Sequence, residues 1–161
     1  MNELSTQLLH DCSVLSDTDP VELRSLYEAA VKELDLLIVD YLTIRDLVSL
    51  AGGGGAPLHL LLIAMFISLY EGSVCLSLSA DSLGKKLRPV AGDRTGTYVR
   101  SILDGIDGFS GLIHTNDASG PQRADDPHES YKPLIVVTDG NRRYLYFHKY
   151  YAAEQSLKST L

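Results

Sequence analysis

The segment from Arg142 to Tyr151 holds the densest group of side chains that could recognise another molecule. It contains five aromatic residues, of the nine tyrosines and three phenylalanines in the chain, together with two arginines, a histidine and a lysine. Aromatic rings interleaved with cations can stack on bases and neutralise phosphates, so the segment is a candidate surface for single-stranded nucleic acid. Its candidate residues are Arg142, Arg143, Tyr144, Tyr146 and Lys149.

A β-hairpin explains the same segment without a ligand. Residues 133–138 form a β-branched apolar run, residues 139–141 read Asp-Gly-Asn, and residues 143–147 return as a second strand. Such a turn supplies the positive-φ residues of a tight hairpin, and aromatic residues are common in strands. Leu145 and Phe147 would then face the core, with Tyr144, Tyr146 and the basic residues outside. We favour this interpretation.

Other catalytic or cofactor motifs are not recognisable in the sequence. Gly84-Lys85 is followed by Lys86 and lacks the preceding glycine of a phosphate-binding P-loop. The glycine run 52–55 has no third glycine at dinucleotide-binding spacing, so it is interpreted as a flexible linker. The five histidines are scattered, at His10, His59, His114, His128 and His148. A small hydrolase site assembled only by the fold remains a third alternative.

The sequence also offers no obvious metal site. Cys12 and Cys75 lie far apart with no ligand at zinc-binding spacing, which predicts neither zinc nor a disulfide framework. Asp125 and Asp126 fall in a polar run and are interpreted as solvated. We therefore expect no catalytic residue, cofactor or metal in this chain.

The composition limits the class of protein. The chain has 161 residues, with 14 Lys and Arg against 21 Asp and Glu, a net charge of −7, and 45% hydrophobic residues. These values predict one globular domain that does not bind nucleic acid over its whole surface. The most apolar run, residues 58–70, is shorter than the roughly 20 residues that cross a bilayer. With no signal-peptide pattern at the N-terminus, we expect a cytoplasmic protein without membrane contact.

Helical patterns dominate the first part of the chain, residues 1–51. Apolar residues at helical spacing from Leu23 to Ile38 predict an amphipathic helix. Thr43 and Asp46 resemble a capping box that opens a short helix ending at Gly52. Pro57 at the first helical position and Gly72 at the end predict a helix over residues 57–71, apolar on nearly all sides and therefore buried at the centre of the domain.

The rest of the chain alternates between short strands and helices. Within the second part, 56–115, residues 73–79 alternate as a strand, Ser79 caps a short helical turn containing Leu83, and residues 95–107 form a helix. The polar composition of residues 116–131 predicts a mobile loop. The last part, 132–161, holds the hairpin 133–147 and a helix from Tyr150 onward. The predicted fold class is α+β: a mainly helical domain around the central helix, with a small antiparallel sheet made of strand 73–79 and hairpin 133–147.

Two blocks of sequence resemble the N-terminal region of exodeoxyribonuclease V alpha subunits, the RecD family. In the first, the apolar run from His59 leads into Ser-Val-Cys-Leu-Ser-Leu at residues 73–78, where the family has an apolar helix and then His-Val-Cys-Leu-x-Leu. In the second, Pro133-Leu-Ile-Val-Val and a turn precede Leu-Tyr-Phe-His-Lys-Tyr-Tyr-Ala-Ala-Glu at residues 145–154. The family pattern there is similar to Leu-Tyr-Leu-x-Arg-Tyr-Trp-x-x-Glu. A weaker similarity covers residues 43–52.

This chain departs from the family pattern at three of these positions. Ser73 replaces a histidine, Lys149 an arginine and Tyr151 a tryptophan. The helicase motifs of the family, which begin with its Walker sequence, follow this region and are not in the chain, so the resemblance implies no catalytic residue.

The resemblance implies an assembly function. It implies a single non-catalytic N-terminal domain, 1–161, that docks the alpha subunit onto the gamma subunit of RecBCD, the helicase/nuclease that processes double-strand breaks for recombination. The expected partners are the gamma and beta subunits, with DNA reached only through the whole complex. A whole family protein would be an ATP-dependent helicase/exonuclease subunit. Aromatic enrichment at interfaces makes Lys149, Tyr150 and Tyr151 the expected partner contacts.

Overall fold

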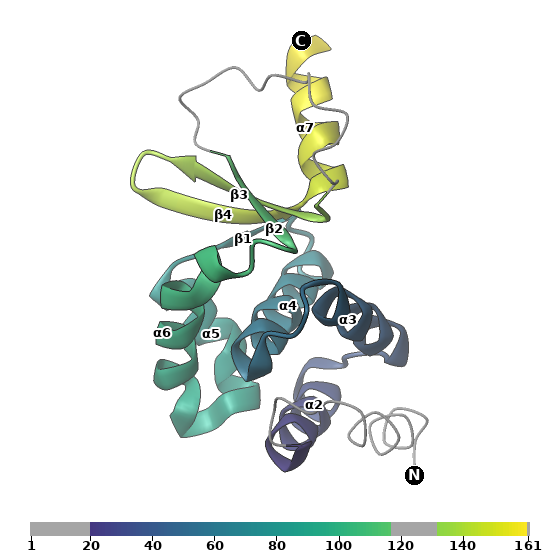
Figure 1. Ribbon diagram of the computed structural model, residues 1–161, viewed down its shortest axis with the longest axis vertical. Helices are drawn as coiled ribbons and strands as arrows, with labels where there is room; N and C mark the ends of the chain where they lie inside the picture. The colour runs from purple at the N-terminus through teal and green to yellow at the C-terminus, as the bar shows by residue number, and fades with distance from the viewer. Residues whose placement is uncertain (1–19, 117–131, 161) are drawn as a thin grey trace.

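The computed structural model describes residues 20–116 and 132–160, and it shows an α+β fold (Figure 1). Among the described residues, five helices form a layer under a four-stranded sheet, and a sixth helix, α7, stands on the opposite side of the sheet. The elements are α2 (Pro20–Leu34), α3 (Ile38–Leu50), α4 (Gly55–Tyr70), β1 (Cys75–Ser77), α5 (Ala80–Ala91), α6 (Thr95–Gly105), β2 (Ile113–Asn116), β3 (Leu134–Asp139), β4 (Arg142–Phe147) and α7 (His148–Thr160), with short 3-10 turns at Gly92–Arg94 and Ile106–Gly108.

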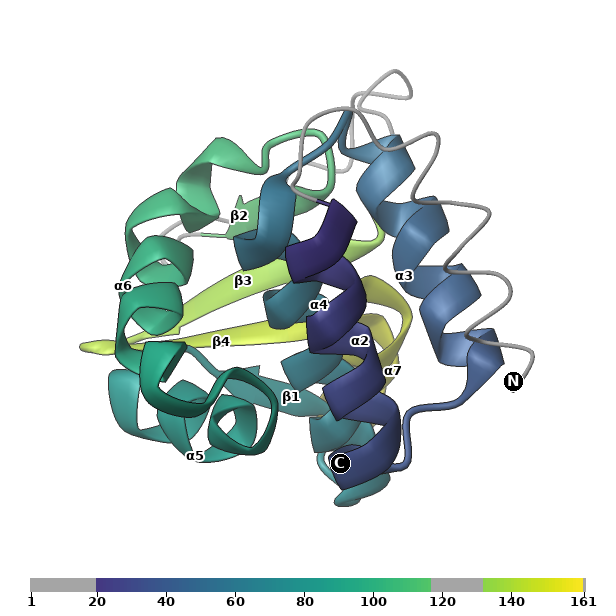
Figure 2. The ribbon, with the colours of Figure 1, turned by 90° about the horizontal axis from the view of Figure 1, so that it is seen from below.

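Helix α4 is the central helix of the fold, as the sequence predicted. Every residue from Leu58 to Met65 is buried, because α4 contacts α2, α3, α5, α6 and β1 (Figure 2). The helix begins at Gly55, two residues before the predicted start, so Pro57 lies within the first turn. Gly72 has a φ of +82° just after the helix, which confirms the predicted left-handed residue. The glycine run before α4 includes Gly54 as its N-cap, so part of the predicted linker belongs to the helix start.

The predicted antiparallel pairing of the first strand with the hairpin is confirmed, and an unpredicted strand, β2, adds a parallel edge that makes the sheet mixed. Its strand order is β1-β4-β3-β2, with antiparallel pairs β1–β4 and β3–β4 and a parallel pair β2–β3. The hairpin is confirmed as β3 and β4, and the first strand is shorter than the predicted 73–79. Strand β2 was not predicted, because a parallel neighbour is paired through a long crossover and leaves no local turn signal. Apart from Asn116, the predicted loop 116–131 lies outside the described residues, as do Cys12, His10, His128, Asp125 and Asp126.

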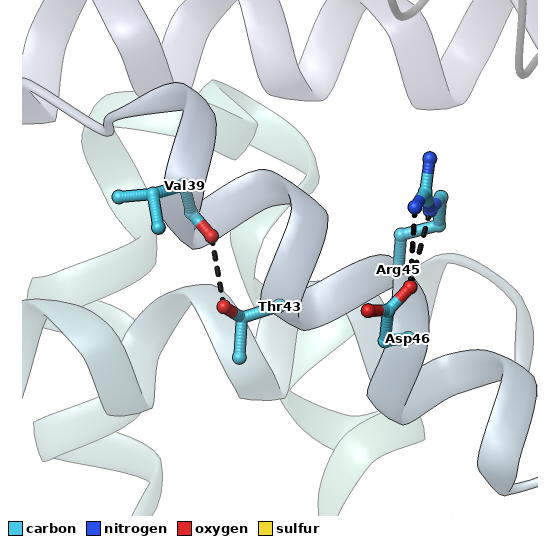
Figure 3. A network of polar contacts seen from close by, with 4 residues as sticks. All are labelled: Val39, Thr43, Arg45 and Asp46. Atoms are coloured by element: carbon cyan, nitrogen blue, oxygen red, sulfur yellow. Dashed lines mark hydrogen bonds and ion pairs between the residues drawn. The ribbon is translucent and has the colours of Figure 1, made fainter.

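The predicted start of the second helix was wrong. Helix α3 begins at Ile38, and the carboxylate of Asp40 accepts a hydrogen bond from the backbone N–H of Leu37 at 2.8 Å. Thr43 and Asp46 lie inside this helix (Figure 3). The Thr43 hydroxyl donates to the Val39 carbonyl at 2.8 Å, and Arg45 pairs with Asp46 at 3.2 Å. Thr43 and Asp46 resemble a capping box by residue type, but the helix has already begun at Ile38.

Helices α5 and α6 differ from their predicted lengths. Ser79 caps α5 as predicted, with its side chain accepting from the Ser82 backbone N–H at 3.2 Å. The helix then continues for 12 residues to Ala91, not for a single turn, and takes Pro89 into its last turn. Leu83, Leu87 and Val90 form its buried stripe. Helix α6 ends at Gly105, and the predicted segment to 107 finishes as a 3-10 turn.

Candidate docking surface

The hairpin positions the residues singled out in the sequence on two faces of β4. Leu145 is buried and pairs with Val136, while Phe147 on the same face is half-buried. Tyr144 and Tyr146 point to the opposite face, as alternation along a strand requires. Arg143 shares the face of Leu145, and its guanidinium donates to the carboxylate of Asp107, in the 3-10 turn after α6, at 2.7 Å. The predicted orientation of Leu145, Phe147, Tyr144 and Tyr146 therefore holds, whereas Arg143, which was expected outside, lies on the core face.

Aromatic contacts on both faces of the sheet anchor the first turn of α7. On the core side, the ring of Phe147 lies 5.7 Å from that of Phe66 in α4 and 6.2 Å from that of Tyr150. On the outer side, the rings of Tyr146 and Tyr151 lie 5.4 Å apart, edge to face. These geometries are the favourable ones for aromatic pairs. Tyr150 and Tyr151, both expected as partner contacts, are therefore half-buried anchors of the helix as well.

Backbone contacts fix the place where α7 leaves the sheet. The His148 backbone N–H donates to the Pro133 carbonyl at 2.8 Å, and its ring Nδ1 lies 3.1 Å from the Lys132 carbonyl. Lys149 is exposed, and its ammonium lies 4.8 Å from the centroid of the Tyr150 ring. We name residues 147–151 together with Lys132 the α7 junction. It presents two lysines, and the ammonium of Lys149 lies beside an aromatic ring.

The five residues of the nucleic-acid alternative are not brought into one patch. Arg142 opens β4 and Lys149 follows its end, which separates them by roughly 20 Å at about 3.3 Å per strand residue. Arg143 is engaged by Asp107, and the Tyr146 ring is engaged by Tyr151. Burial, the Cys75 thiol and the Glu154 carboxylate raise the pKa of Tyr146, so an acidic group stands beside this ring. An acidic neighbour opposes the approach of phosphate.

The two described parts of the chain carry opposite formal charges. Residues 132–160 carry five Lys or Arg and two Asp or Glu, a formal charge of +3. Residues 20–116 carry eight and eleven, a formal charge of −3. The hairpin and α7 are therefore a basic unit attached to an acidic helical layer.

Helix α7 holds a feature that the sequence interpretation missed. The helix begins at His148, two residues before the predicted start, and none of its residues is fully buried. Leu157 has 68% of its surface exposed. The spacing Tyr150, Ala153, Leu157 follows i, i+3, i+7, which marks one helix face and could have identified this stripe from the sequence.

The two described histidines outside α7 lie in separate elements. His59 is buried in α4 and shares a 2.6 Å hydrogen bond with the Tyr27 hydroxyl, whereas His114 is on β2. Within residues 20–116 and 132–160, no group of three His, Cys, Asp or Glu side chains could hold a metal ion. In the same two ranges, no helix has both the length and the apolar content to cross a bilayer.

Comparison with known proteins adds no relative. No protein-family model, curated protein or solved structure matches the chain.

Proposed function

We propose that this chain is a non-catalytic assembly domain, similar to the N-terminal domain of an exodeoxyribonuclease V alpha subunit, and that it docks onto the gamma subunit in the cytoplasm. The single observation that carries the proposal is α7. It stands on the far side of the sheet from the helical layer and has no fully buried residue (Figure 1). A helix of 13 residues is marginal alone in water, so one that leaves its fold in this way needs a second packing surface.

The resemblance supports the same surface. Its first block spans most of α4 and β1, and its second block spans β3, β4 and the start of α7. These elements contact one another, with α4 on β1, β1 on β4 and β4 on α7. The similar residues therefore form one continuous body that ends in the exposed helix. Lys149, Tyr150 and Tyr151 lie where this body meets α7.

The test is direct binding. The purified 161-residue chain is immobilised, and the gamma subunit encoded in the same genome is passed over it, with the beta subunit as a separate analyte. We expect saturable binding of the gamma subunit, and recruitment of the beta subunit when both are present. Failure of the gamma subunit to bind, or measurable ATP hydrolysis by the purified chain, contradicts the proposal.

A second assay addresses the nucleic-acid alternative. A 20-nucleotide oligo(dT) is titrated against the chain at low salt, where non-specific binding is strongest. Under the assembly proposal, no saturable binding occurs. Tight binding that falls steeply with salt would support the nucleic-acid surface instead.

A further inference from the structure

The exposed side of α7 has the pattern of a helix that fits into a groove. Tyr150, Ala153 and Leu157 lie on one face, at i, i+3 and i+7. Ala153 and Leu157 are exposed, and Tyr150 is half-buried with its ring edge on Phe147. Helices that dock into grooves use anchors at this spacing. The stripe begins at the fixed end of the helix, so its first anchor is already positioned.

Cations flank this stripe. Lys149 lies at the start of the helix, and among the described carboxylates none pairs with it. Lys158 lies near the other end, one residue beyond Leu157, and pairs with Glu154 at 2.6 Å. Lys132 adds a third positive charge at the α7 junction. A partner that covers the stripe therefore meets ammonium groups at both ends of it.

We propose that α7 inserts its Tyr150–Ala153–Leu157 stripe into an apolar groove of a partner protein, and that carboxylates on the rim of the groove receive Lys149 and Lys158. This inference rests on the proposed assembly function and names the chemistry of its partner surface. Leu157 is the main anchor, since a large aliphatic side chain with 68% exposure gains the most from burial. Lys149 and Lys158 set orientation and association rate.

Other occupants fit the helix less well. A second copy of α7 would bring Lys149 and Lys158 against like charges. A nucleic acid would gain little from Ala153 and Leu157, which neither stack on bases nor contact phosphate. The acidic charge of residues 20–116 would oppose the same ligand.

The experiment compares two exposed leucines in the intact chain. Leu157→Asp changes the stripe, whereas Leu50→Asp changes a leucine of similar exposure, 61%, at the end of α3. Both leucines are exposed, so both variants should keep the wild-type circular dichroism and melting temperature. We expect Leu157→Asp to weaken gamma-subunit binding by at least about tenfold, a typical loss for a main anchor, and Leu50→Asp to change it by less than about twofold.

A charge-reversal variant tests the rim. Lys149→Glu should slow association with the gamma subunit and flatten its dependence on salt, since steering by opposite charge acts mainly on the association rate.

The outcomes separate this inference from the function on which it rests. If the wild-type chain binds the gamma subunit and Leu157→Asp binds equally well, the proposal that α7 enters a groove is wrong and the proposed assembly function stands. If wild-type chain does not bind the gamma subunit, both proposals fail. If oligo(dT) binds and Lys149→Glu abolishes that binding, α7 serves nucleic acid and the groove is again wrong.

Discussion

The hydroxyl of Tyr27 and Nδ1 of His59 lie 2.6 Å apart, inside the core that joins α2 to α4. The Tyr41 ring stands edge-on to Tyr27, with centroids 4.8 Å apart. Burial lowers the pKa of His59 to about 4, so the imidazole is neutral in the folded chain at neutral pH. The Tyr27–His59 hydrogen bond and the Tyr27–Tyr41 ring contact together connect three helices, α2, α4 and α3.

The depressed pKa of His59 predicts loss of stability in acid. The unfolded histidine binds a proton near pH 6.5 and the folded one near pH 4, so stability is full above about 6.5 and falls as the pH drops toward 4. Linkage gives a loss of about 2 kcal/mol at pH 5. Urea unfolding at pH 7.5 and pH 5 measures it. His59→Gln should lower stability at pH 7.5 and reduce the difference between the two pH values. An unchanged difference in that variant would assign the acid sensitivity to other groups.

Removal of the Arg143 guanidinium should have a small effect on stability. Its ion pair with Asp107 is partly exposed, and such pairs contribute about 1 kcal/mol or less. We expect Arg143→Ala and Asp107→Ala to be similar, and the double variant to cost little more than either, in thermal unfolding at low salt. Strictly additive losses would show that the pair contributes nothing. Arg143→Ala should also leave gamma-subunit binding unchanged, because Arg143 is at the opposite end of β4 from α7.

Phe147→Ala should release α7 more than it destabilises the rest of the fold. Phe147 connects Phe66 of the helical layer with Tyr150 of α7, and loss of its ring should cost roughly 3 kcal/mol. Hydrogen exchange followed by mass spectrometry should show faster exchange in residues 148–160 than in α4. The control is Phe109→Ala, which removes a half-buried ring packed against the core on the helical side and should leave α7 exchange unchanged. Equal acceleration across the whole chain would mean that α7 is not separately anchored.

Two glycine substitutions should change the free energy of unfolding in opposite directions. A Cβ at Gly84, inside α5, meets no atom within 4 Å, so Gly84→Ala should stabilise the chain by about 0.5–1 kcal/mol through helix propensity. Gly72→Ala also meets open space, but its φ of +82° strains a side chain, so it should destabilise by about 1 kcal/mol. Urea denaturation of the two variants compares them directly. A destabilising Gly84→Ala would contradict the open geometry at α5.

The parts of the fold that the sequence predicted are those with local signals. The all-round apolar run of α4 requires burial, and the Asp-Gly-Asn turn determines the β3–β4 pair. The Ser79 cap also has a local sequence signal. The parallel pairing of β2 has no such signal, because its partner strand follows a long connection. The end of α5 was missed because Pro89 in a last turn resembles a helix break by residue type.

The candidate surface was likewise predictable only where its features are local in the sequence. Its composition, with Lys149, Tyr150 and Tyr151, is visible in the sequence as an aromatic and basic cluster. Tyr150 and Tyr151 anchor the helix on Phe147 and Tyr146. These contacts depend on the direction in which α7 leaves the sheet, and the spacing of residues in the sequence does not specify that direction. The engagement of Arg143 by Asp107 likewise joins residues 36 positions apart.

The strand order gives the hairpin a particular place in the synthesis of the chain. Within the described sheet, β1 pairs with β4 and β2 pairs with β3, so each outer strand depends on a neighbour made later. A ribosome that has released residues 20–116 has exposed the helical layer and two strands with no partner. Phe66 of α4, which Phe147 of β4 finally contacts, and the edge of β1 that pairs with β4 are then open to solvent and to chaperones. Folding of the sheet therefore waits for residues 132–160, which also carry α7.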